Sequence, residues 1–251
     1  MKKLSSFLLF IAVIFGCLIG CNNIDEADET RLDVTLDQTY GAIHNDVINS
    51  VIPTLRTKAQ SEEHFSLEEF ANIMLTNTVQ AFSDNGLDIG DFSEADVNSF
   101  IECVSILKFY KGRKSELVNH YISSEVVSDE MQLILSDFFN GCIESNQLSS
   151  GDFEKLYREK VALVPPADQE LLTIICGIGE SSYDLWNTNE TKANKITGET
   201  IYSTLLDAGA GILLVGLNPF VGIAVSGAVS MWARTVDLEE AVDNVADSTT
   251  D

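Results

Sequence analysis

AGAGILLVGLNPFVGIAVSGAVSMWA, the stretch from Ala208 to Ala233, decides the fold of this chain. It holds 26 residues without a charge, between Asp207 and Arg234. Small residues recur four positions apart, as at Gly222 and Ser226, a spacing that lets helices approach closely. Pro219 near the middle is expected to bend or break a helix. The residues that we assign to membrane contact or core packing are Gly209, Gly211, Gly216, Pro219, Gly222, Gly227 and Trp232.

This stretch admits several structures. One kinked helix would extend roughly 39 Å at about 1.5 Å per residue, enough to cross a hydrocarbon core of about 30 Å. A hairpin folded at Asn218-Pro219 has arms of about 16–21 Å, which are too short to span. Such a hairpin would be buried against the domain or lie shallowly in a membrane. A third structure is a helix pair at the centre of a soluble core, and a fourth is a membrane-active segment. The many Gly, Ala, Ser, Asn and Pro residues lower its hydrophobicity toward the insertion threshold and favour the buried or shallow hairpin.

The rest of the chain has a helical pattern. An amphipathic stripe begins at Leu32 and reaches Leu55, with Pro53 expected to kink or end it. Capping-box sequences begin helices after Ser66 and Ser93. Further helices are expected at about 114–122, 128–146, 150–163 and 168–183, and no alternating strand pattern of useful length occurs. The sequence therefore predicts an all-α multi-helix bundle with a C-terminal Gly/Ala-rich apolar helical hairpin or kinked helix.

The N-terminus has the features of an export signal. Lys2 and Lys3 precede an apolar run from Leu4 to Gly16, and Leu18-Ile19-Gly20-Cys21 resembles the lipobox of bacterial lipoproteins. This resemblance implies removal of residues 1–20 and acylation of Cys21. An uncleaved transmembrane anchor would need about 18 or more apolar residues. An ordinary secretory signal would need a better placed small-residue cleavage site.

Composition changes divide the chain into six expected parts. They are a lipoprotein signal peptide (1–20), an acidic flexible tether (21–31), a helical domain (32–186), a polar linker (187–198), an apolar Gly-rich helical segment (199–236) and an acidic tail (237–251). The net charge of −24, from 39 acidic and 15 basic residues, argues against binding to nucleic acid or to anionic lipid surfaces.

The sequence contains few residues in an arrangement that points to catalysis. His44, His64 and His120 lie far apart, and His44-Asn45-Asp46 is the most suggestive group, although a packed or surface histidine is favoured over a catalytic one. Gly177-Ile178-Gly179 lacks the third glycine of a dinucleotide site. No catalytic residue, metal site or cofactor is expected, apart from the lipid on Cys21. An acidic loop is a further candidate, and a solvated turn is favoured there over a weak Ca²⁺ site; its residues are Asp84, Asp88, Asp91 and Asp96. Three cysteines remain, of which one pair could form a disulfide: Cys103, Cys142 and Cys176.

Two short motifs and the terminal segment carry a resemblance. Tyr40-Gly41-Ala42-Ile43-His44-Asn45 and Ser181-Ser182-Tyr183-Asp184-Leu185-Trp186, with the Gly/Ala-rich end, resemble a set of helical Bacteroidetes lipoproteins of unassigned function. The resemblance implies a helical fold in the outer membrane or at the cell surface and contributes no catalytic residue. We expect a non-enzymatic, lipid-anchored protein that binds an envelope protein or glycan. The alternatives are a membrane-active or bacteriocin-like protein using residues 206–232, and then an envelope enzyme.

Overall fold

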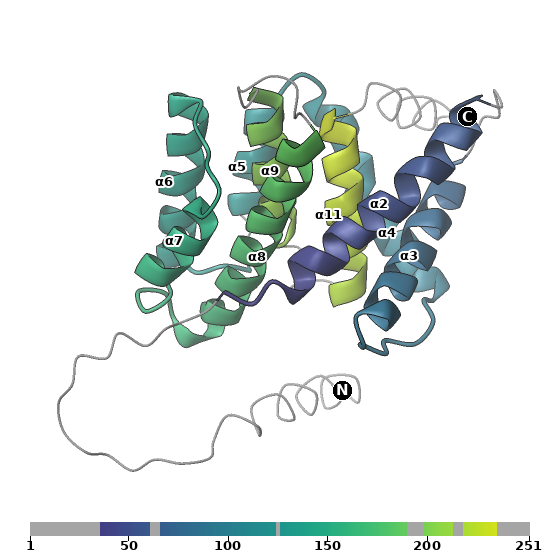
Figure 1. Ribbon diagram of the computed structural model, residues 1–251, viewed down its shortest axis with the longest axis horizontal. Coiled ribbons are helices and arrows are strands. Elements are labelled where there is room, and N and C mark those ends of the chain that lie inside the picture. Colours follow the sequence, from purple (N-terminus) through teal and green to yellow (C-terminus); the bar gives the residue numbers. More distant parts are fainter. Residues whose placement is uncertain (1–35, 61–65, 124–125, 190–197, 213–217, 235–251) are drawn as a thin grey trace, which may run out of the picture. The chain divides into compact units, whose positions relative to one another are not determined.

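The computed structural model describes residues 36–60, 66–123, 126–189, 198–212 and 218–234, and all of them belong to one unit that begins at Thr35 (Figure 1). Every regular element among these residues is a helix, which confirms the expected all-α fold. The elements are α2 (Thr39–Gln60), α3 (Leu67–Asp84), α4 (Glu94–Ser105), the 3-10 helix η1 (Ile106–Tyr110), α5 (Lys114–Ile122), α6 (Asp129–Ser145), α7 (Asp152–Lys160), α8 (Pro166–Asn189), α9 (Gly198–Ala210) and α11 (Pro219–Arg234). The expected signal peptide, the tether, most of the linker and the acidic tail lie outside the described residues.

Local capping signals begin several helices where the sequence predicts them. Ser66 Oγ accepts a hydrogen bond from Glu69 N at 3.1 Å, and Glu69 Oε2 accepts one from Ser66 N at 2.9 Å. Ser93 and Asp96 form the same reciprocal pair at α4. Each box satisfies backbone donors that the first helical turn leaves unpaired. Pro166 begins α8, where its missing N–H costs nothing.

The first helix begins later than the sequence predicts, and it continues past Pro53, which was expected to kink or end it. It begins at Thr39 rather than near Leu32, since residues 36–38 are not helical. Pro53 does not end it, because α2 continues to Gln60. Pro53 is exposed, whereas Val51 and Leu55 on either side of it are buried. Packing of that apolar face compensates for the backbone hydrogen bond that proline removes.

The apolar stretch forms two helices, α9 and α11, at the centre of the core. Every residue of α11 from Phe220 to Ala233 is buried, as is α9 from Ser203 to Ala210. They pack against each other; α11 also contacts α2, α3 and α4, whereas α9 also contacts α5, α6 and α8. Figure 1 shows α9 and α11 between these two groups of helices. No helix in the described part of the chain combines the length and the hydropathy needed to cross a membrane.

Small residues let neighbouring helices approach this central pair closely. Pro219 begins α11, and Asn218 Oδ1 accepts a hydrogen bond from Phe220 N at 3.1 Å, so the expected break is where one helix starts. A Cβ on Gly227 would lie 3.2 Å from Met74 Cε of α3. A Cβ on Gly211 would lie 3.2 Å from Ile178 Cδ1 of α8. Gly216 lies outside the described residues.

Candidate functional site

A buried polar cluster joins four helices at the centre of the bundle. We call it the Asp207 cluster; its members are His44 of α2, Ser182 and Trp186 of α8, Asp207 of α9 and Ser230 of α11. Trp186 is 7% exposed and the other four are fully buried. A buried carboxylate is costly unless hydrogen-bond donors surround it.

The donors around Asp207 come from two other helices. Asp207 Oδ2 accepts hydrogen bonds from Ser182 Oγ, from Ser230 Oγ at 2.7 Å and from Trp186 Nε1 at 3.3 Å. Trp186 Nε1 also lies 3.0 Å from Ser230 Oγ. In addition, Ser226 Oγ donates to the backbone carbonyl of Asp207 at 3.1 Å. The carboxylate therefore ties α9 to α8 and α11 through directional bonds that apolar packing alone cannot supply.

His44 completes the cluster from α2. Its Nε2 lies 3.9 Å from Asp207 Oδ2, and its Nδ1 lies 3.1 Å from Asn45 Oδ1, a geometry in which Nδ1 donates. Burial lowers the pKa of His44 to about 4, against the smaller raising effects of Asn45 and the Ser226 backbone. The imidazole is therefore neutral at pH 7 despite the nearby carboxylate.

The cluster holds the residue types of a hydrolase triad but not its geometry. In a triad the histidine takes the proton of the serine, and the aspartate orients the histidine. Here the Ser182 hydroxyl donates directly to Asp207, so no imidazole lies in place to activate it. All three side chains are fully buried. The arrangement is suited to fixing helix positions rather than to nucleophilic catalysis.

The sequence singled out His44 and the motif that holds Ser182 and Trp186, but it missed Asp207 and Ser230, which join them. Asp207 was interpreted only as the boundary of the uncharged stretch, yet its side chain is fully buried in the core. The available signal was its position: one acidic residue between Ile201 and Ala233, in a run otherwise typical of a core. Asp46, next in the His44 motif, instead accepts a hydrogen bond from Asn85 at 3.1 Å.

The two short motifs, residues 40–45 of α2 and 181–186 of α8, lie against each other in the structure. Asn45 Nδ2 of α2 donates to Ser181 O of α8 at 2.7 Å, across 136 residues of sequence. A Cβ on Gly41 would lie only 2.3 Å from Gly177 O and from Ser181 Oγ. Gly41 therefore permits the close crossing of α2 and α8.

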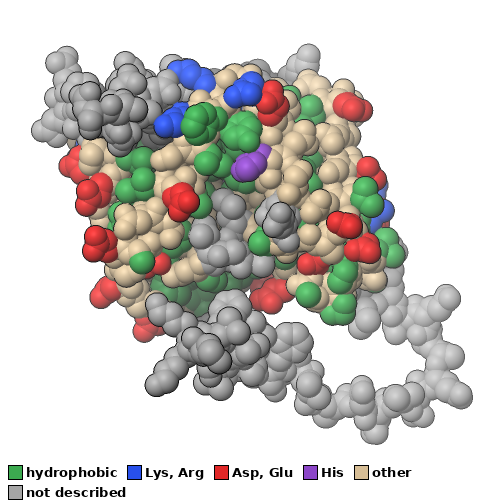
Figure 2. All heavy atoms as spheres, turned by 180° about the vertical axis from the view of Figure 1, so that it is seen from behind, with side chains coloured by type: hydrophobic (Ala, Val, Ile, Leu, Met, Phe, Trp, Pro, Cys, Tyr) green, Lys and Arg blue, Asp and Glu red, His purple; other side chains and the backbone are tan. Residues whose placement is uncertain are grey.

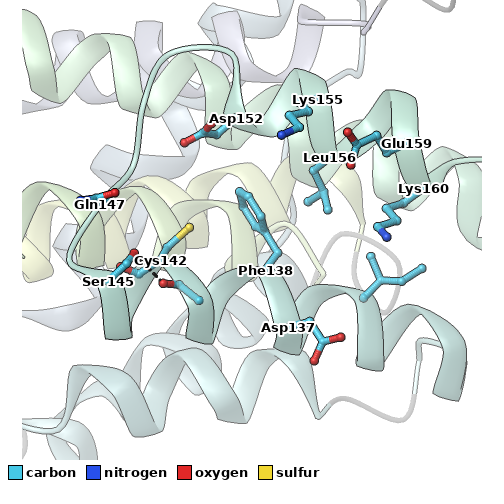
Figure 3. Close-up of a pocket in the computed structure, with 12 residues that line it drawn as sticks. Asp137, Phe138, Cys142, Ser145, Gln147, Asp152, Lys155, Leu156, Glu159 and Lys160 are labelled. Carbon is cyan, nitrogen blue, oxygen red and sulfur yellow. Dashed lines mark hydrogen bonds between the residues drawn. The ribbon is translucent and has the colours of Figure 1, made fainter.

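An open groove lies between α6 and α7, with a volume of about 480 Å³. Phe138 and Cys142 project from α6 toward α7, and Leu156 projects from α7 between the two helices (Figure 3). Charged side chains line the same groove: Asp137, Asp152, Lys155, Glu159 and Lys160. Apolar side chains bordered by charges of both signs are a lining typical of a binding surface. Of the residues that line the groove, only Cys142 was a candidate from the sequence, as one of three cysteines that could form a disulfide.

The other candidates contribute no ligand cluster. The described residues contain no group of three or more His, Cys, Asp or Glu side chains that could hold a metal ion. In the acidic loop, Asp88 Oδ1 accepts a hydrogen bond from Gly90 N, and Asp96 caps α4. The three described cysteines are free thiols: Cys103, Cys142 and Cys176.

Comparison with protein-family models, with curated proteins and with solved structures finds no match for this chain.

Proposed function

We propose that this chain is a lipid-anchored protein of the cell envelope, in the outer membrane or at the cell surface, that binds an envelope protein or glycan. The observation that carries the binding role is the α6–α7 groove, with apolar side chains inside and charges of both signs around them. The polar Asp207 cluster, in contrast, is closed from solvent.

The anchor is argued from Leu18-Ile19-Gly20-Cys21. Acylation at Cys21 would supply the membrane attachment, and stable attachment requires more than one chain or signal, as a multiply acylated cysteine provides. The apolar stretch is then not needed as an anchor. Its burial in α9 and α11 supports this division of roles, because those residues already have core partners.

The anchor is tested by lipid labelling in a bacterial host. The wild-type chain should incorporate radioactive palmitate and partition with membranes, whereas the Cys21→Ala variant should do neither. A matched Cys103→Ala variant should behave like the wild type, because Cys103 lies inside the helical body. Equal labelling of the wild type and the Cys21→Ala variant would contradict the anchor.

The groove is tested by site-specific photo-crosslinking in intact cells. A photoreactive residue in place of Lys155, in the groove, should give a discrete adduct of higher mass. The same residue in place of Leu87, which is exposed on another part of the surface, should not. Adducts of equal yield at both positions, or none at Lys155, would rule out the groove as the binding surface.

The membrane-active alternative makes an opposite prediction on liposomes. If α9 and α11 serve the core, the mature chain should release no trapped dye at any pH or lipid composition. Leakage would show that residues 206–232 leave the core and would replace the proposed function with the alternative.

A further inference from the structure

The segment from Lys108 to Lys114, KFYKGRK, forms a cationic and aromatic patch on an otherwise acidic protein. We call it the 108–114 patch. It holds four of the 15 basic residues of the chain within seven positions and no acidic residue. Lys108, Phe109, Lys111 and Arg113 are exposed, and Phe109 is 61% exposed. Figure 2 shows Lys and Arg side chains gathered at one edge of the molecule beside hydrophobic ones and a histidine.

Local structure holds the patch in place. The 3-10 helix η1 ends at Tyr110, and Gly112, with φ of 71°, turns the chain into α5. Arg113 pairs with Glu116 at 3.0 Å and donates to the carbonyl of Phe109. Lys114 Nζ donates to Ala233 O, at the end of α11, at 2.6 Å. The patch is therefore anchored to the core of the bundle.

We propose that the 108–114 patch contacts the anionic phospholipid headgroups of the membrane that carries the protein. An exposed aromatic ring flanked by lysines is the side-chain combination found at membrane interfaces, where the ring enters the headgroup region and the cations bind phosphate. Lys108 Nζ lies 5.1 Å from the centroid of the Phe109 ring, so the two groups would reach the surface together.

The net charge of −24 does not oppose this contact at the patch. Charges are screened over about 8 Å at physiological ionic strength, so distant carboxylates act weakly on it. Glu116, the carboxylate nearest to the patch in sequence, is paired with Arg113. The expected repulsion from anionic lipid then applies to the rest of the surface and favours the patch as the face that meets the membrane.

This inference rests on the proposed lipid anchor, which brings the protein to a membrane but does not determine which face of the protein contacts it. Leu36 lies fifteen positions after Cys21, a chain length that reaches at most about 50 Å. That reach permits many orientations. The 108–114 patch would select one of them.

The test uses tryptophan quenching by lipids brominated on their acyl chains. Trp186 and Trp232 are buried, so a Phe109→Trp variant adds an exposed tryptophan at the patch. A Leu133→Trp variant is the matched control, because Leu133 on α6 is 66% exposed. The full processed protein is placed on brominated phosphatidylcholine vesicles, with or without phosphatidylglycerol.

The added quenching, relative to wild type, should be at least threefold greater for Phe109→Trp than for Leu133→Trp, and only with phosphatidylglycerol. Adding Lys108→Glu and Lys111→Glu should abolish it, whereas the equal charge change Lys155→Glu with Lys160→Glu should not. Equal quenching at both positions, or none on anionic vesicles, overturns the proposal. Acylation is measured separately by mass, and unacylated protein is given the same vesicles, so failure of the anchor is distinguishable from failure of the patch.

Discussion

Gly41 lies where the backbones of α2 and α8 come closest. A Cβ on Gly41 would lie 2.3 Å from Gly177 O, and a Cβ on the opposing Gly177 would lie 2.5 Å from Asp37 O. Both contacts involve backbone atoms, which cannot rotate away. The crossing therefore depends on two glycines that a propensity argument alone would count as weak points in a helix.

A Gly41→Ala substitution should destabilise the fold by about 1–3 kcal/mol or more, because it overpacks this crossing. The control is Gly141→Ala in α6, where a Cβ meets nothing within 4 Å and φ is not positive. That change should stabilise the fold by about 0.5–1 kcal/mol through helix propensity alone. Urea unfolding followed by circular dichroism measures both; equal shifts in the two variants would show that the crossing is not tight.

His44 should make stability depend on pH. Its pKa is about 4 in the fold against an ordinary value of 6.5. As the pH falls, His44 therefore binds a proton in the unfolded chain before it does so in the folded chain. Its contribution to the free energy of unfolding is present above pH 6.5 and is lost as the pH falls toward 4. We expect a loss of about 2 kcal/mol between pH 7 and pH 5 from this residue.

The measurement is urea unfolding at both pH values for wild type and for a His44→Gln variant. The variant should lose less stability than wild type over this interval, since it lacks the buried base. A His44→Gln variant with the wild-type pH dependence would refute the assignment.

At the scale of elements, α4 is a helix whose start can be predicted from local sequence. Ser93 and Asp96 were read from the sequence as a cap, and the structure pairs them at 2.8 Å between Ser93 N and Asp96 Oδ2. Capping can be predicted because both partners lie within one turn. The end of α2 could not be predicted in the same way, since Pro53 is tolerated only because α2 is packed along its buried face.

Ser93→Ala should cost about 1 kcal/mol by removing the cap of α4. Ser99→Ala, in the interior of the same helix, is the matched control. Ser99 Oγ donates only to Ala95 O within the helix, so its loss should change stability by less than about 0.5 kcal/mol. Thermal unfolding of both variants tests this, and an equal cost would mean that the capping bond contributes little.

At the scale of the whole molecule, the reaction rates of the cysteine thiols measure how readily the helical bundle opens. Cys176 is fully buried and Cys142 is 8% exposed, and burial raises the pKa of Cys142 to about 11. Cys103 is only partly buried. Because the thiolate is the reactive form, buried thiols with a raised pKa react slowly.

In the native protein, a thiol reagent such as DTNB should modify Cys103 fastest and Cys142 and Cys176 at least tenfold more slowly. In urea, all three should react at similar rates. A Cys103→Ser variant should lack the fast native phase. Rapid reaction of all three thiols without urea would show that the bundle opens readily.

Local sequence by itself determined the helical class, most helix starts and the apolar character of residues 208–233, because these depend on capping and periodicity over a few residues. The tertiary structure decided the rest. It placed α9 and α11 in the core, gathered His44, Ser182 and Asp207 from three helices and opened a groove between α6 and α7. These outcomes depend on contacts between residues far apart in the chain, such as the Asn45–Ser181 bond across 136 positions, and no short-range pattern encodes them.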